Sequence, residues 1–201
     1  MNTDCTVRRK AVTISLGEYV AAYRDEQKFM EYCRQCPNYA RLWSCPPFDD
    51  CKDRIFRDYS QITIFASIIT PDSSDIPLAQ SSEIIIPERR RLERILLEME
   101  YRYTGYAFAY AGSCLNCPQG TCTRPSGGRC RHPQLVRPSL EAYGFDIGKT
   151  TTTLLGIDLC WSTGGRIPPY LTLVTAIMHN QPSPEVIETY FLKTLSEDYT
   201  G

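Results

Sequence analysis

A chain of 201 residues is long enough for one α/β domain with a proper core. Its apolar fraction of 42% and charged fraction of 22% exclude an intrinsically disordered chain. The net charge of -1 at pH 7 argues against nucleic acid or an anionic membrane surface as a partner, and it leaves the oligomeric state open.

The first ten residues are polar and basic and lack the apolar core of a signal peptide, so we expect a cytoplasmic protein. Ser15, followed by Glu18, indicates a capping box and a helix over 17–31. A short helix is predicted over 51–59. The β-branched run over 61–70 predicts a buried strand, and it is too short to cross a bilayer.

Apolar residues at helical spacing predict a helix from Pro87, a favoured first helical residue, to Tyr103. The remaining predicted elements are a strand over 106–111, helical segments over 139–143 and 146–155, a strand over 170–178, and a last helix capped by Ser183. Strands separated by helices predict the α/β class. We expect a single domain over 1–201, with a mixed sheet flanked by helices and two cysteine-rich metal-binding loop regions near 33–51 and 114–130.

Cysteine is the outlier of the composition, with ten residues. A chain of this length without an export signal does not need disulfides, so grouped cysteines indicate metal binding or redox chemistry. Eight of them form two groups, each led by a Cys-x2-Cys pair: Cys33, Cys36, Cys45 and Cys51, then Cys114, Cys117, Cys122 and Cys130. Their Pro and Gly neighbours favour turns around an inorganic centre over the core positions of buried free thiols.

The second group has the spacing Cys-x2-Cys-x4-Cys-x7-Cys, and four such thiolates suit tetrahedral zinc or a cubane iron–sulfur cluster. In the first group, Cys33, Cys36 and Cys45 form the stronger part. The fourth ligand there stays open among Cys51, Cys5, Cys160 and a group from outside the chain.

Three of the cysteines, Cys36, Cys45 and Cys117, are followed directly by Pro, a step familiar in bacterial ferredoxin ligand runs. This favours iron–sulfur clusters, one or two of the 4Fe-4S type. Zinc is the alternative, because four-cysteine zinc sites use the same pairs. His132, close to Cys130, is a candidate ligand or a hydrogen-bond donor to a cluster sulfur; the other interpretation is a turn residue.

At these residues the chain resembles a family of cysteine-rich predicted metal-binding proteins, a domain of unknown function. The motifs that carry the resemblance are Cys33-Arg-Gln-Cys36-Pro, Trp43-Ser-Cys45-Pro-Pro47, Cys114-Leu-Asn-Cys117, Cys130-Arg-His-Pro133 and Arg137-Pro-Ser-Leu-Glu-Ala142. The resemblance runs from about residue 30 to the last predicted strand. It implies metal binding, and electron transfer to a partner redox or corrinoid enzyme.

A zinc-stabilised protein-interaction module without redox activity is the alternative function. No catalytic residue is predicted, because the sequence has no recognisable Ser/His/Asp or paired-carboxylate arrangement. Whether the protein is an enzyme is left open.

Overall fold

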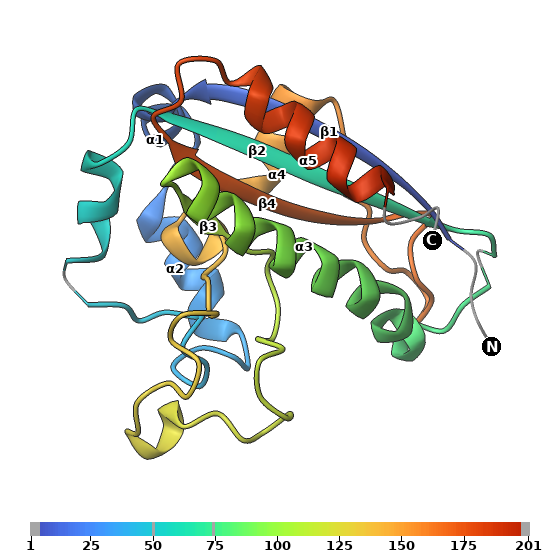
Figure 1. Ribbon diagram of the computed structural model, residues 1–201. Helices are drawn as coiled ribbons and strands as arrows, with labels where there is room; N and C mark the ends of the chain where they lie inside the picture. Colours follow the sequence, from blue (N-terminus) through green and yellow to red (C-terminus); the bar gives the residue numbers. More distant parts are fainter. Residues whose placement is uncertain (1–4, 50, 74, 198–201) are drawn as a thin grey trace.

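The computed structural model describes residues 5–49, 51–73 and 75–197. Its centre is a four-stranded sheet made of β1 (Cys5–Ser15), β2 (Gln61–Pro71), β3 (Tyr106–Phe108) and β4 (Leu171–His179). The strand order is β1-β2-β4-β3, and all three neighbouring pairs are antiparallel (Figure 1).

The helices are α1 (Leu16–Tyr23), α2 (Glu26–Gln35), α3 (Ser81–Tyr103), α4 (Ile147–Thr150) and α5 (Glu185–Glu197). Turns of 3-10 helix are η1 (Lys52–Arg57), η2 (Leu78–Gln80), η3 (Arg124–Ser126) and η4 (Glu141–Tyr143), and η5 (Thr151–Leu155) is a turn of π-helix. No helix in the described ranges has the length and apolar character needed to cross a bilayer.

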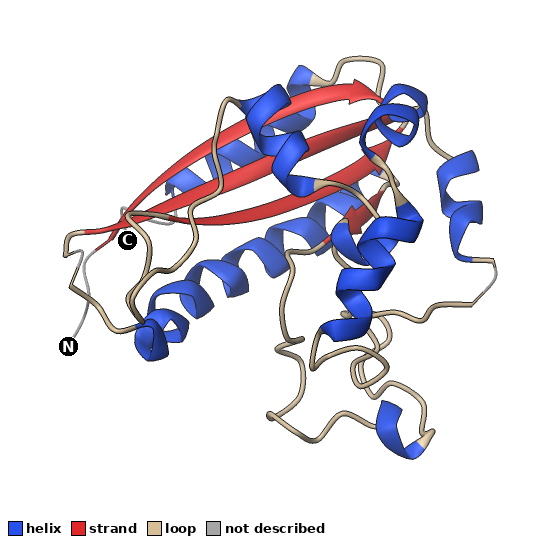
Figure 2. Cartoon of the chain, turned by 180° about the vertical axis from the view of Figure 1, so that it is seen from behind, coloured by secondary structure: helices blue, strands red, loops and turns tan. Residues whose placement is uncertain are grey.

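The sheet has a hydrophobic core on each face, because side chains alternate along its strands. Phe65 and Ile69 of β2 face the core under α3 and α5, and Phe65 stacks on Phe191 with 3.9 Å between ring centroids. Ile62 and Ile64 face the opposite core with Tyr19 and Phe145. Figure 2 shows this second face from behind, with α4 and α1 on it.

A lobe extends from one end of this scaffold. It consists of α2, the loop 36–49 and the loop 112–137, and in Figures 1 and 2 it lies below the sheet and α3. We call it the cysteine lobe. Its backbone is mostly turns, as the Pro and Gly content of these segments predicts.

The predicted α/β class and the sheet flanked by helices are confirmed. The prediction of a mixed sheet is wrong, since each hydrogen-bonded pair of named strands is antiparallel. β2 and β3, joined through α3, run in the same direction, but β4 pairs with both and lies between them. A helical connection between two strands therefore does not make them neighbours here.

Several helices and strands begin or end at residues other than the predicted ones. The single helix over 17–31 is two helices, because the chain turns at Arg24, which bridges to Phe145. Ser15 makes no side-chain capping bond. Pro87 lies inside α3, which begins at Ser81, and the predicted strand over 106–111 ends at Phe108. The strand β1 has no counterpart in the sequence prediction.

Candidate metal centre

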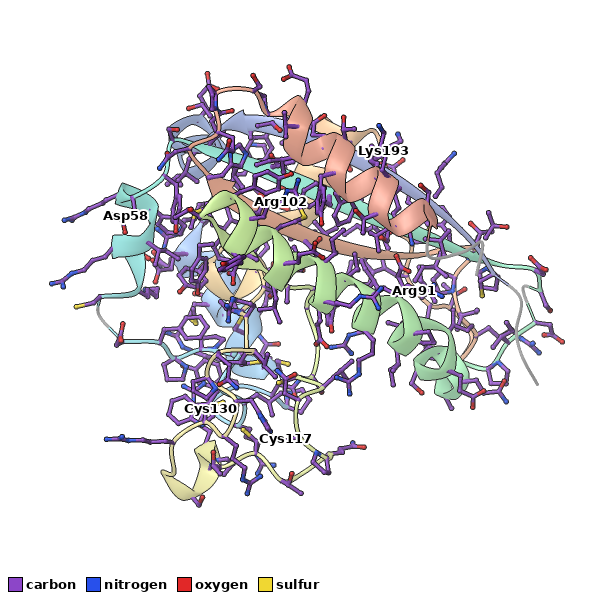
Figure 3. The ribbon with its side chains drawn as sticks, viewed as in Figure 1. Asp58, Arg91, Arg102, Cys117, Cys130 and Lys193 are labelled. Atoms are coloured by element: carbon purple, nitrogen blue, oxygen red, sulfur yellow. The ribbon has the colours of Figure 1, made fainter. Side chains whose placement is uncertain are left out.

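The two predicted cysteine groups lie in and beside the cysteine lobe. Cys33 is in the last turn of α2, and the other seven predicted ligands lie outside helices and strands. Figure 3 labels Cys117 and Cys130 in the loops of the lobe, on its side away from the sheet. No disulfide joins any of the ten cysteines within the described residues. None of the eight predicted ligands is fully buried, and Cys36 and Cys51 are exposed.

The first group brings Cys33, Cys36 and Cys45 together. Burial raises the pKa of the Cys45 thiol to about 11, the Ser44 side chain opposes the rise, and the charges of Cys36 and Cys33 add to it. Burial, followed by the charge of Cys36, also raises the pKa of Cys33. These mutual effects place the three thiols within electrostatic range of one another.

The second group brings Cys114, Cys117 and Cys130 together. Burial raises the pKa of Cys114, and a backbone hydrogen bond from Asn116 opposes the rise. The charges of Glu93, Cys117 and Cys130 raise the pKa further. Loop 112–137 thus folds back so that Cys114 lies within electrostatic range of Cys130, although the two are far apart in its sequence.

His132 contacts the second thiol group through its backbone. Its backbone N–H donates to Cys130 Sγ at 3.4 Å. Its carbonyl oxygen accepts the N–H groups of Leu135 and Val136 at 3.0 and 3.2 Å, which closes a turn. A hydrogen bond to the Cys130 sulfur is one of the roles predicted for His132, beside those of a ligand and of a turn residue, but the donor is its amide. The role of the imidazole stays a prediction.

The other predicted cysteines are placed differently. Cys122 is half-buried within loop 112–137, and exposed Cys51 lines a groove with Trp43 and Arg124. Of the alternatives for the fourth ligand, Cys5 pairs with Pro71 in the β1–β2 ladder and Cys160 contacts Tyr170. Both lie outside the cysteine lobe.

Within residues 5–49, 51–73 and 75–197, no three Cys, His, Asp or Glu side chains converge as a formed metal-ion site. The donor chemistry of each group nevertheless fits a metal that prefers thiolate ligands. Each group offers three thiols, most of them partly shielded from water, on loops whose side chains can rotate. The ligand roles of the individual cysteines stay predictions.

A single arginine joins the two loops. The guanidinium of Arg124, at the start of η3, donates to the carbonyl oxygen of Leu42 at 2.5 Å and also to those of Cys45 and Pro47. It lies over the Trp43 ring, 5.2 Å from the ring centroid. Three backbone carbonyls of the first loop are thereby tied to the second.

α3 holds the second loop from the other side. Arg89 donates to the carbonyl of Ser113, and Arg90 Nη2 donates to that of Leu115 at 2.7 Å. These carbonyls flank Cys114. Arginines interspersed with glutamates along a helix ordinarily indicate a solvated, ion-paired face, so the sequence does not predict either contact. Nothing in the local pattern indicates that a loop returns to these side chains.

A cavity of about 50 Å³ separates α3 from the lobe, and residues of both cysteine groups line it. Cys45 comes from the first group and Cys114 from the second. Arg89 also lines the cavity, with its guanidinium carbon 4.1 Å from the centroid of the Tyr110 ring. The two thiol groups therefore adjoin one shared space beside a cationic side chain.

The comparisons with known proteins agree with this donor chemistry. A family model described as "Predicted metal-binding protein (DUF2284)" matches residues 20–178, a span that contains both cysteine groups. Neither a search of curated proteins nor a search of solved structures gave a match. The chain belongs to this family of predicted metal-binding proteins.

Proposed function

We propose that this protein is an iron–sulfur protein that passes single electrons to a partner redox or corrinoid enzyme. The observation that carries the proposal is the joint placement of two thiol groups, on loops tied to each other and next to one cavity. Clusters of the 4Fe-4S type, held by thiolates, supply one-electron redox chemistry. Two neighbouring sites would give the electron a path through the lobe.

The residues that would hold the clusters are Cys33, Cys36 and Cys45 in the first site, and Cys114, Cys117, Cys122 and Cys130 in the second. The surrounding groups suit negative charge on these sulfurs. Arg124 lowers the pKa of Cys45, although burial outweighs it. The His132 amide donates to Cys130. Cations and hydrogen bonds at the sulfurs favour the more negative, reduced state of a cluster.

Partial exposure supports exchange of electrons with a partner. Cys36 is exposed, and the nearby Trp43 is 37% exposed although it is large and apolar. A transient electron-transfer contact needs only a small interface. We expect the partner to meet the lobe at the first site, where these side chains reach the surface.

The test is purification without oxygen after expression in iron-replete cells. We expect iron and acid-labile sulfide in equal amounts, and an electron paramagnetic resonance signal that appears on reduction with dithionite. Zinc without labile sulfide would contradict the proposal and favour the zinc-stabilised interaction module.

Matched variants assign the two sites. Cys36→Ser should remove the metal of the first site and leave the second loaded, and Cys117→Ser should do the reverse. Cys160→Ser, outside the lobe, should retain all the metal. Equal metal content in all three variants would contradict both sites.

A further inference from the structure

Glu141 is the first residue of η4, and one oxygen of its carboxyl group lacks a hydrogen-bond partner. Its Oε2 atom is buried and makes no hydrogen bond within the described residues. Burial raises the pKa of this carboxyl, while the backbone of Glu141 and the Ser139 side chain oppose the rise. A buried carboxyl oxygen without a partner is costly, so such an atom often marks the position of an ion.

The backbone of Glu141 lies beside the first thiol group. Cys33 Sγ donates to the backbone oxygen of Glu141 at 3.9 Å. After burial and the charge of Cys36, the charge of Glu141 is the next cause that raises the pKa of Cys33. The side chain is therefore within electrostatic reach of that thiol.

The backbone around Glu141 is fixed against the start of α2. The N–H of Asp25 donates to Gly144 O at 2.9 Å, and the N–H of Asp146 donates to Tyr23 O at 2.8 Å. Arg24 Nε donates to Tyr143 O at 2.8 Å. These bonds hold η4 under the helix that carries Cys33.

We propose that Glu141 supplies the fourth ligand of the first site, with Cys33, Cys36 and Cys45 as the other three. The inference rests on the proposed function, since it takes the first thiol group as a cluster site. On binding, one carboxylate oxygen would bond to one iron, and any proton that the carboxyl carries would leave to solvent. Of the cysteine alternatives, Cys5 and Cys160 lie outside the lobe, and Cys51 is the one that the experiment has to distinguish from Glu141.

The experiment uses the full chain with Cys117→Ser, so that only the first site is loaded. In that background, Glu141→Gln should lose the iron that its carboxylate binds, about a quarter of the iron of that site. The oxidised protein should then give the paramagnetic signal of a three-iron cluster. Glu141→Cys should keep a four-iron cluster. Glu31→Gln, an exposed glutamate on α2, is the matched control and should behave as the parent.

Other outcomes would overturn the inference. Full iron in Glu141→Gln, with loss in Cys51→Ser, would assign the fourth ligand to Cys51 and leave the proposed function standing. A parent chain without iron would overturn both. Metal-free Glu141→Gln should unfold at the same temperature as the metal-free parent. A lower unfolding temperature, together with Glu141→Cys failing to load, would show a merely structural role.

Discussion

At the start of η3, the guanidinium of Arg124 is the largest single source of contact between the two cysteine loops. It donates to three carbonyl oxygens of loop 36–49. A further bond joins Trp43 Nε1 to Thr123 Oγ1 at 3.3 Å, and another joins Asn38 to Ser113 at 3.2 Å. Hydrogen bonds to a charged group are stronger than these neutral ones. Arg124 should therefore dominate the stability of the lobe.

Arg124→Gln should weaken the closed lobe by about 1–3 kcal/mol, since several charge-assisted bonds of a partly exposed group are lost. Hydrogen exchange measures this at the amides of Ala40 and Cys45, which donate to Pro46 O and Leu42 O at 2.8 and 3.1 Å. Arg129→Gln, at an exposed position in the other loop, is the control. Equal exchange rates in the two variants would contradict the role of Arg124.

His179, at the end of β4, belongs to a chain of hydrogen bonds through the core. Its Nε2 bonds to Thr63 Oγ1 at 2.8 Å, Thr63 bonds to Thr13 at 2.8 Å, and Thr13 donates to Glu188 at 2.7 Å. Nδ1 accepts the N–H of Gln181 at 3.1 Å. A ring that accepts at Nδ1 and is fully buried is neutral, with its proton assigned to Nε2.

This network predicts a loss of stability in weak acid. Burial lowers the pKa of His179 from 6.5 to about 4. Since the folded state prefers the neutral ring, the stabilisation is complete above pH 6.5 and is lost as the pH falls towards 4, by roughly 3 kcal/mol in total. Urea unfolding between pH 7.5 and 4 measures it. His179→Gln should flatten the slope in this window, and an unchanged slope would contradict the assignment.

At the scale of elements, the sequence analysis does not predict the strand β1 or the contacts of its charged residues. Charged residues stand side by side in it, so it shows no apolar alternation. Two of these charges have distant partners: Arg9 pairs with Glu88 at 2.8 Å, and Lys10 Nζ donates to Leu155 O at 2.6 Å. Glu88 lies on the buried stripe of α3, and its ion pairs with Arg9 of β1 and Arg91 of α3 explain why a charge is tolerated there.

Other elements are predictable because their signals are local. The β-branched run of β2 and the apolar stripe of α3 appear directly in the sequence. The spacing of the cysteines likewise predicts both thiol groups. The junction of the loops is not predictable in this way, because Arg124 binds backbone carbonyls, which carry no residue signature. Glu141 is hidden for a similar reason, since a glutamate next to a turn is usually solvated.

Gly144 is the residue that fits η4 against α2. Its φ is +87°, and an added Cβ would lie 2.6 Å from the Cα of Glu26. Gly144→Ala should destabilise the fold by about 2 kcal/mol or more and should lower metal loading at the first site. Gly120→Ala is the control, since its φ is +77° with nothing within 4 Å of the added atom. Equal losses in urea unfolding would mean that backbone strain, and not the close approach, sets the cost.

At the scale of the whole molecule, α3 links the scaffold to the cysteine lobe. One side of this helix packs on the sheet through Leu92, Ile95 and Met99. Arg89 and Arg90, in the third turn of the helix, hold the segment around Cys114. The second loop is thus tied to the scaffold, and Arg124 ties the first loop to the second. Because the first loop is held to the scaffold through the second, we expect metal binding at the second site to stabilise the first loop as well.

Trypsin digestion tests that coupling, because exposed Arg41 and Arg129 report on the first and second loops. Metal in the second site alone, as in Cys36→Ser, should slow cleavage at Arg129 and also at Arg41, since binding stabilises every segment ordered with the site. Adding Arg124→Gln should abolish the protection of Arg41 and keep that of Arg129. Cleavage at exposed Arg166, outside the lobe, should not respond to metal. If cleavage at Arg41 slows only when metal occupies the first site, the two loops bind metal independently.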